Sequence, residues 1–208
     1  MIRGRSVLLL LNGELREPAA VKALARVADA VLCADGGARH ARTLGLAPDC
    51  VVGDMDSLPR PLPRNWRRTE FLRDCDENRS DLDKALDAAA AAGARRVWVA
   101  GALGGGLDHE LANWATLEAR GGGLEIVVVG GGGAARLLGP GRHDLEMRRG
   151  ERFSLVAAPR ARVSLAGARY PLRGEILARG SRGLGNRAEG RVVLTVRSGR
   201  AWLISGRA

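Results

Sequence analysis

Residues 48–57 read PDCVVGDMDS, a short apolar run that ends in a glycine and is followed by two acids. Similar runs recur along residues 7–129, at 7–11, 30–33, 50–52, 97–100 and 126–129. Helical patterns separate them, and short apolar strands that alternate with helices are typical of a parallel sheet with crossover helices. The pattern predicts a Rossmann-like α/β domain.

Four amphipathic segments between these runs predict the helices, near residues 18–28, 38–44, 81–92 and 108–120. The third segment has the clearest start. Ser80 is a candidate N-cap, and Asp83 follows three residues later as in a capping box. Leu82, Leu86 and Ala89 form an apolar stripe along the same helix.

The pattern changes after residue 129. The stretches GGGGAA at 130–135 and GPG at 139–141 interrupt it, and helical periodicity does not return. Short, partly β-branched segments between Gly or Pro turns predict strands at 152–157, 162–165, 175–178, 191–196 and 201–204. We therefore predict an α/β domain at 1–140 and a β-rich domain at 141–208.

Composition and charge exclude several classes of protein. The three cysteines among 208 residues have no CxxC spacing, which argues against a disulfide framework or a zinc site and favours a reducing cytoplasm. The net charge of +10 comes from scattered arginines with little aromatic interleaving, so a solvated basic surface is favoured over a nucleic-acid interface. The apolar run at 7–11 is too short for a membrane span or a signal peptide, and we interpret it as a buried strand.

Acidic residues follow the predicted strands or open the predicted helices, where ligands of open parallel sheets bind. Carboxylates gathered at one edge would repel each other unless a cation balanced them, and Mg²⁺ is commonly held by carboxylates together with substrate phosphates. Alternate residues of an extended segment point the same way, so Asp54 and Asp56 could address one metal ion. These acids are Asp35, Asp54, Asp56, Asp81 and Asp108.

Simpler interpretations exist for parts of this pattern. Asp35-Gly36-Gly37 taken alone is more often a turn, and Asp81 taken alone is more often a partner of a helix dipole. The glycines at 101–106 could be a flexible connector, or their backbone N–H groups could bind phosphate at a helix N-terminus. The sequence contains neither a P-loop nor the dinucleotide-binding glycine fingerprint.

The ordered motifs LLNGEL, ADGGA, PDCVVGDMDS, SDLDKAL and GALGGGLDHELAN resemble those of the thiamine pyrophosphokinase family. The resemblance covers residues 9–113 and continues through SLVAAP, RYPL and RGSRGLGN. It implies an α/β catalytic domain followed by a small β-sandwich domain. It also implies a homodimer that uses Mg²⁺ and converts ATP and thiamine to thiamine diphosphate and AMP.

The resemblance also implies roles for individual residues. The catalytic set is Asp54, Asp56, Asp81 and Asp108, of which Asp54, Asp56 and Asp81 are expected to bind the metal. Either Asp81 or Asp108 could accept the hydroxyl proton of the acceptor. The expected ATP-site residues are Asn12, Gly13, Asp35, Gly36, Gly37, Lys84, Gly104 and Gly105. The expected thiamine-site residues, at a site between subunits, are Tyr170, Ser181 and Asn186.

The chain departs from the family pattern at three places. Gly106 stands where the family has an arginine, Tyr170 stands where it often has tryptophan, and its Ser-Asn-Glu ending reads Gly185-Asn186-Arg187 here. Two alternatives therefore stay open within the family fold: a pyrophosphokinase for another small alcohol such as a hydroxymethylpterin, and an ATP- or thiamine-binding homologue with impaired catalysis. A nucleic-acid-binding module is the further alternative that the high pI suggests.

Overall fold

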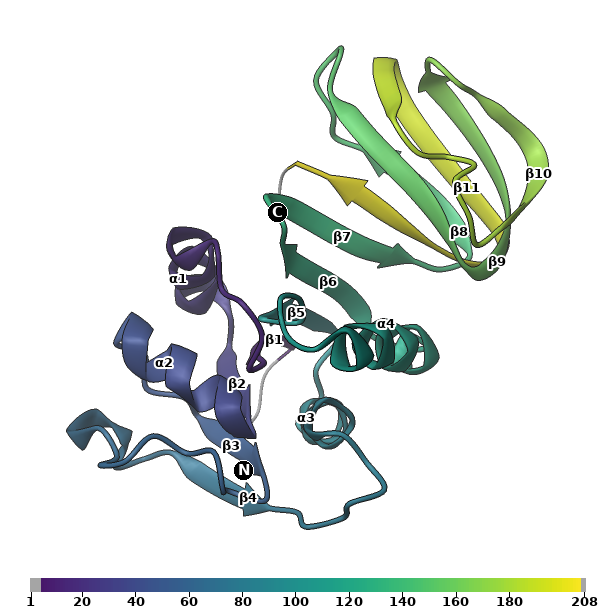
Figure 1. The fold of residues 1–208 in the computed structure, drawn as a ribbon. Coiled ribbons are helices and arrows are strands. Elements are labelled where there is room, and N and C mark those ends of the chain that lie inside the picture. The colour runs from purple at the N-terminus through teal and green to yellow at the C-terminus, as the bar shows by residue number, and fades with distance from the viewer. Residues whose placement is uncertain (1–4, 207–208) are drawn as a thin grey trace. The chain divides into compact units, whose positions relative to one another are not determined.

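A computed structural model describes residues 5–206, and the chain divides into two compact units, Met1–Gly132 and Gly133–Ala208 (Figure 1). We call them the first and the second unit. The division falls before the expected boundary near residue 140. The reason is that β7 (Gly133–Leu138) is a strand that pairs with β11 (Asn186–Ser205) of the second unit.

The first unit is built on a parallel sheet in the order β6-β5-β1-β2-β3-β4. Its strands are β1 (Ser6–Leu10), β2 (Ala30–Ala34), β3 (Cys50–Gly53), β4 (Glu70–Arg73), β5 (Arg96–Ala100) and β6 (Glu125–Gly130). Strand β1 is central, with Leu8 in register with Val31 on one side and Trp98 on the other. The five predicted strands are present. Strand β4 was not predicted, because it is an exposed edge strand with little apolar signal.

Four α-helices accompany this sheet: α1 (Pro18–Val27), α2 (Ala38–Leu44), α3 (Asp81–Ala91) and α4 (Leu107–Arg120). Figure 1 shows α1 and α2 on one face of the sheet and α3 and α4 on the other, so the inner strands are buried from both sides. The predicted cap of α3 is confirmed, because Ser80 Oγ accepts the backbone N–H of Asp83 at 3.2 Å. Within residues 5–206 we found no helix of the length and apolarity that crossing a membrane would require.

The second unit is built of strands alone within residues 133–206. These strands are β7, β8 (Gly141–Leu145), β9 (Arg152–Ala168), β10 (Leu172–Ala178) and β11. The order is β10-β9-β11-β7, and β8 also pairs with β11. Apolar side chains such as Val163, Leu177 and Leu194 form its core.

Two details of the prediction for the second unit were wrong. Residues 130–135 do not simply interrupt the pattern: the turn lies at Gly131 and Gly132, which have positive φ, and β7 begins at the next residue. The predicted strands at 152–157 and 162–165 are parts of one long strand, β9, and those at 191–196 and 201–204 are parts of β11.

Candidate active site

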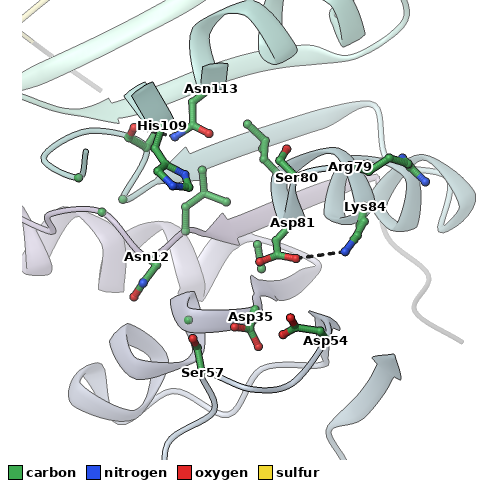
Figure 2. A pocket seen from close by; sticks show the side chains of 18 of the residues that line it. Asn12, Asp35, Asp54, Ser57, Arg79, Ser80, Asp81, Lys84, His109 and Asn113 are labelled. Atoms are coloured by element: carbon green, nitrogen blue, oxygen red, sulfur yellow. Dashed lines mark hydrogen bonds and ion pairs between the residues drawn. The ribbon is translucent and has the colours of Figure 1, made fainter. Parts of the chain in front are cut away.

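The first unit contains a cavity of about 730 Å³, which is in the range of roughly 300–1,000 Å³ usual for small-molecule sites. It lies where β1, β2, β3 and β5 end and where α3 and α4 begin (Figure 2). The sequence predicted a site at this edge of the sheet. The residues that line the cavity include Asn12, Gly13, Asp35, Gly36, Asp54, Asp56, Ser57, Arg79, Ser80, Asp81, Lys84, Gly105, Gly106, His109, Glu110 and Asn113.

A tight turn directly after β2 holds Asp35 at the edge of the cavity. The chain turns at once into the 3-10 helix Asp35–Gly37. A Cβ on Gly37 would lie 2.0 Å from the carbonyl oxygen of Leu10, so only glycine lets this turn approach β1 so closely. Asp35 is 4% exposed and has a φ of +33°, a conformation that costs energy for residues other than glycine. The turn therefore buries a carboxylate beside the end of β3.

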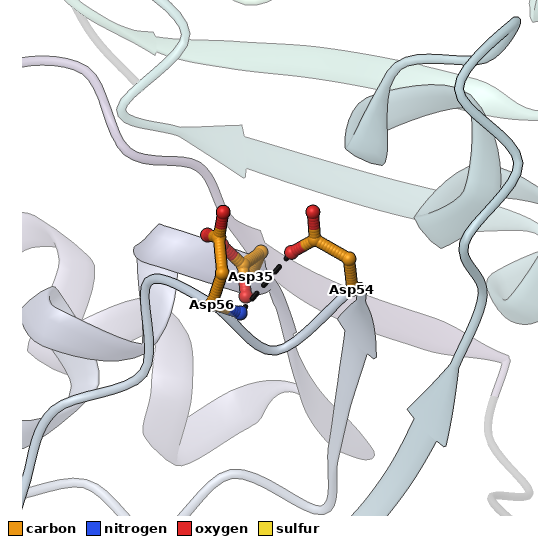
Figure 3. A group of neighbouring side chains, drawn as sticks. All are labelled: Asp35, Asp54 and Asp56. Carbon is orange, nitrogen blue, oxygen red and sulfur yellow. Dashed lines mark hydrogen bonds between the residues drawn. The ribbon is translucent and has the colours of Figure 1, made fainter.

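The side chains of Asp35, Asp54 and Asp56 meet at this point (Figure 3), with one carboxylate oxygen from each within 4.8 Å of the others. Asp54 Oδ1 accepts the backbone N–H of Asp56 at 3.1 Å, and Met55 between them has a φ of +73°. This tight turn brings both acids to the side of Asp35. Oxygens that share one Mg²⁺ lie at most about 4.2 Å apart, so small side-chain rotations would complete the set.

A polar atom without a partner supports the same interpretation. Asp35 Oδ1 is buried and has no hydrogen-bond partner in the protein. A buried carboxylate oxygen without a partner is costly, and a divalent cation would satisfy it. The three aspartates thus fit a hard cation such as Mg²⁺, which prefers oxygen ligands.

Burial and mutual repulsion perturb two acids of the site. The pKa of Asp35 is raised, chiefly by burial and further by the charges of Asp81, Asp54 and Asp56, although Ser57 opposes the shift. Burial also raises the pKa of Asp81, which the charge of Lys84 opposes. A carboxyl group whose pKa is raised on folding binds its proton more tightly in the folded protein, so deprotonation lowers stability as the pH rises. A bound cation would offset this cost.

Asp81 lines the cavity but belongs to a separate pair. Its Oδ1 lies 3.5 Å from the ammonium of Lys84, which is 6% exposed and donates a hydrogen bond of 2.9 Å to the carbonyl oxygen of Asp74. The structure thus groups Asp35, rather than Asp81, with Asp54 and Asp56. The metal role of Asp81 stays a prediction.

The glycine-rich loop before α4 presents fewer free N–H groups than the sequence suggested. The N–H of Gly104 already donates to Glu110 Oε1 at 2.6 Å, whereas Gly105 and Gly106 line the cavity. Asp108 is exposed, and its Oδ1 accepts the backbone N–H of His109 at 2.9 Å. Three of the predicted catalytic and ATP-site residues are not among those that line the cavity: Gly37, Gly104 and Asp108.

Several lining residues were not predicted. Ser57 Oγ donates to Asp56 Oδ1 at 2.8 Å. Asn113 donates to the carbonyl oxygen of Ala102 at 3.0 Å and so fixes the loop before α4. Arg79 directly precedes the N-cap of α3, and a cation at that place was the available signal for an anion site.

The three predicted thiamine-site residues lie in the second unit. The side-chain amide of Asn186 is 3% exposed and holds the backbone of Tyr170, accepting its N–H at 3.1 Å and donating to its carbonyl oxygen at 2.9 Å. Tyr170 and Ser181 are exposed, and the guanidinium of Arg169 lies 5.7 Å from the Tyr170 ring. Asn186 therefore positions Tyr170, while its own amide is already bonded.

Comparison with known proteins gives consistent results. The family model described as "Thiamin pyrophosphokinase, catalytic domain" matches residues 21–128. The thiamine pyrophosphokinase of Bacillus subtilis has a similar structure, with a TM-score of 0.79, 21% identity and coverage of 98% of this chain and 99% of that one.

Two further solved structures have the same fold. The enzyme of Geobacillus thermodenitrificans gives a TM-score of 0.78 at 22% identity, with 96% of each chain covered. The enzyme of Candida albicans gives 0.77 at 14% identity, with 98% of this chain and 92% of that one covered. No curated protein sequence matched the chain.

Proposed function

Because this chain belongs to the thiamin pyrophosphokinase family, we propose that it transfers the pyrophosphoryl group of ATP to the hydroxyl of thiamine, releasing thiamine diphosphate and AMP. The observation that carries the proposal is the group Asp35, Asp54 and Asp56 beside the cavity. All three acids lie inside the segment that the family model matches. Such a group has little use in a protein that does not handle a cation and phosphates.

Different residues of the first unit would bind the metal ion and the phosphates in this reaction. Asp35, Asp54 and Asp56 would hold Mg²⁺, whose charge neutralises the phosphates. The N-termini of α3 and α4 point toward the cavity and orient an anion there. In this family of reactions, positioning and electrostatics supply most of the acceleration.

A base must accept the proton of the attacking hydroxyl. Asp81 and Asp108 were the two candidates, and of these Asp81 lines the cavity. The raised pKa of Asp81 suits proton transfer, since a base works best when its pKa approaches the working pH. We assign this role to Asp81.

In this proposal, the second unit supplies the residues that bind the acceptor, thiamine. We propose that the first unit is the Rossmann-like ATP-binding domain and the second a sandwich-like thiamine-binding domain, in a cytoplasmic homodimer with the acceptor site between subunits. Tyr170 has the exposed ring that can stack on the cationic ring of thiamine. Asn186 fixes the backbone of Tyr170, and Ser181 lies exposed in the loop between β10 and β11.

Nucleotide products separated by chromatography test the proposal. Purified protein is incubated with ATP, Mg²⁺ and one acceptor at a time, from thiamine to other small alcohols including a hydroxymethylpterin. We expect AMP to form with thiamine and not without it. AMP release with another alcohol only would show that thiamine is not the acceptor. ADP release would show that the enzyme transfers a single phosphoryl group instead of a pyrophosphoryl group. Binding of ATP and thiamine without any product would indicate a homologue with impaired catalysis.

A further inference from the structure

The cavity of the first unit has many more negative than positive side chains. Among the described residues that line it, Arg79 and Lys84 carry the full positive charges. A polyphosphate that enters would meet strong repulsion, so each cation within reach matters for binding. The acids in the same lining are Asp35, Asp54, Asp56, Asp76, Glu77, Asp81 and Glu110.

Lys84 is already committed within the protein. It is buried, and its ammonium donates to the carbonyl oxygen of Asp74 at 2.9 Å and lies 3.5 Å from Asp81 Oδ1. Turning this ammonium toward a ligand would leave a part-buried carbonyl and a half-buried carboxylate without their partner. Lys84 therefore contributes the attraction of its positive charge to ligand binding, rather than direct hydrogen bonds.

Arg79 is held in a different way. It directly precedes the N-cap of α3 (Figure 2), and its side chain, about one third exposed, forms an ion pair with Asp87. Asp87 has a second partner, since Arg120 of α4 donates to its Oδ1 at 2.7 Å and to its Oδ2 at 3.5 Å. Arg120 is anchored in turn by Asp83, whose Oδ1 accepts from Nε at 3.0 Å. If Arg79 left, Asp87 would keep an arginine on its carboxylate.

We propose that Arg79 is a phosphate-binding residue, which exchanges Asp87 for the polyphosphate of the ligand while Arg120 retains Asp87. The inference rests on the proposed use of ATP. The exposed ion pair that is given up contributes little, whereas a guanidinium on phosphate forms two charge-assisted hydrogen bonds. The N-terminus of α3, which begins two residues later at Asp81, favours an anion at the same place.

The direct test measures binding by calorimetry, without thiamine, for wild-type protein and variants. The ligands are ATP and inorganic tripolyphosphate, each with Mg²⁺. Arg79→Gln should weaken both by about tenfold, since one charge-assisted contact is lost. Arg79→Lys should bind with intermediate affinity, because it keeps the charge and loses the planar fork. The matched control is Arg96→Gln. Arg96 is paired with Glu125 where β5 and β6 begin, at the ends of the strands opposite the cavity, so this variant should bind as wild type does.

The exchange itself makes a second prediction that a merely structural role would not produce. Asp87→Asn removes the carboxylate that Arg79 must leave, so it should tighten tripolyphosphate binding by about threefold. Arg120→Gln leaves Arg79 as the main partner of Asp87 and should weaken binding by a similar factor. Neither change should alter the affinity further in protein that already carries Arg79→Gln.

Each outcome decides the inference. Binding by both Arg79 variants with wild-type affinity would overturn it, and so would an effect of Asp87→Asn that persists without Arg79. Should Arg79→Gln fail to fold, Arg79→Lys and Asp87→Asn carry the test. Tripolyphosphate binding that depends on Arg79, in protein that makes no thiamine diphosphate, would support this inference and contradict the proposed function. Wild-type protein that binds neither ligand would overturn both.

Discussion

Two buried polar residues, Asp35 in the first unit and Asn186 in the second, are in opposite situations. Asp35 is buried with one oxygen unpartnered. The positive-φ residues other than glycine in the described chain are Asp35 itself and Met55, which lies between the other two acids of the group. In the second unit, the buried Asn186 is bonded through both of its amide atoms. Asp35 thus keeps an unfavourable local arrangement that a ligand can relieve, whereas the hydrogen bonds of Asn186 serve stability.

The largest expected effect concerns the acid group. Asp54→Asn should lower thiamine-dependent AMP formation by at least about a hundredfold, because a metal-binding charge is lost. The melting temperature should hardly change, since Asp54 is exposed and an amide oxygen can still accept the N–H of Asp56. Rates from an AMP assay and a thermal melt measure the two effects.

Asp49→Asn is the matched control for that variant. It makes the same chemical change just before β3, at the opposite end of the strand that leads to Asp54. There Asp49 accepts the backbone N–H of Val31 at 2.8 Å and takes no part in the cavity. Equal activity of Asp54→Asn and Asp49→Asn would rule out the metal assignment.

The buried amide of the second unit should matter for stability. Asn186→Ala removes both hydrogen bonds to the Tyr170 backbone and should lower the free energy of unfolding by about 2 kcal/mol. Denaturant titration measures this loss. Tyr170→Phe keeps the backbone contacts and should unfold as wild type does. A variant at Asn186 with unchanged stability would show that water replaces these bonds without cost.

Removing the strained acid of the first unit should have the opposite sign. Asp35→Asn should raise the melting temperature of the Mg²⁺-free protein at neutral pH by about 4 °C, since burial raises the pKa of this acid and its charge opposes folding. The gain should shrink as the pH falls through that raised pKa, because protonated Asp35 carries no charge. Added Mg²⁺ should stabilise the wild type more than the variant. A less stable Asp35→Asn protein at neutral pH without Mg²⁺ would contradict this account.

The smallest expected effect lies at the start of α3. Ser80→Ala removes the cap on the Asp83 N–H and should lower the free energy of unfolding by about 1 kcal/mol or less. Ser80→Asp restores an acceptor and should recover most of the loss. A drop of several kcal/mol in Ser80→Ala would mean that the serine supports more than the helix end.

The sequence predicted the buried parts of the fold well, for a physical reason. Strands covered on both faces are continuous apolar runs, as at β1 and β2, and the cap of α3 depends on neighbouring residues alone. Strand β4 escaped prediction because three of its four residues are exposed. Strand β7 escaped because its first residue continues a run of glycines, and its pairing with distant β11 makes it a strand.

In the candidate site, too, contacts between residues close in sequence could be predicted, whereas contacts that depend on strand pairing or helix packing could not. Asp54 and Asp56 could be placed together from their spacing, since one short turn brings them to the same side. That Asp35 joins them depends on β2 pairing with β3, and that Arg79 and Arg120 share Asp87 depends on how α3 and α4 pack. The sequence also suggested free N–H groups at 101–106, but the side chain of Glu110 takes the one at Gly104.

The most direct test of the central claim is a phosphorus NMR record of the products formed by wild-type protein and by Asp54→Asn from ATP, Mg²⁺ and thiamine. Attack at the β-phosphorus predicts equal amounts of AMP and thiamine diphosphate with the wild type, and neither product above background with the variant. Formation of ADP with thiamine monophosphate would contradict pyrophosphoryl transfer. Undiminished products from Asp54→Asn would contradict the assignment of the reaction to the acid group.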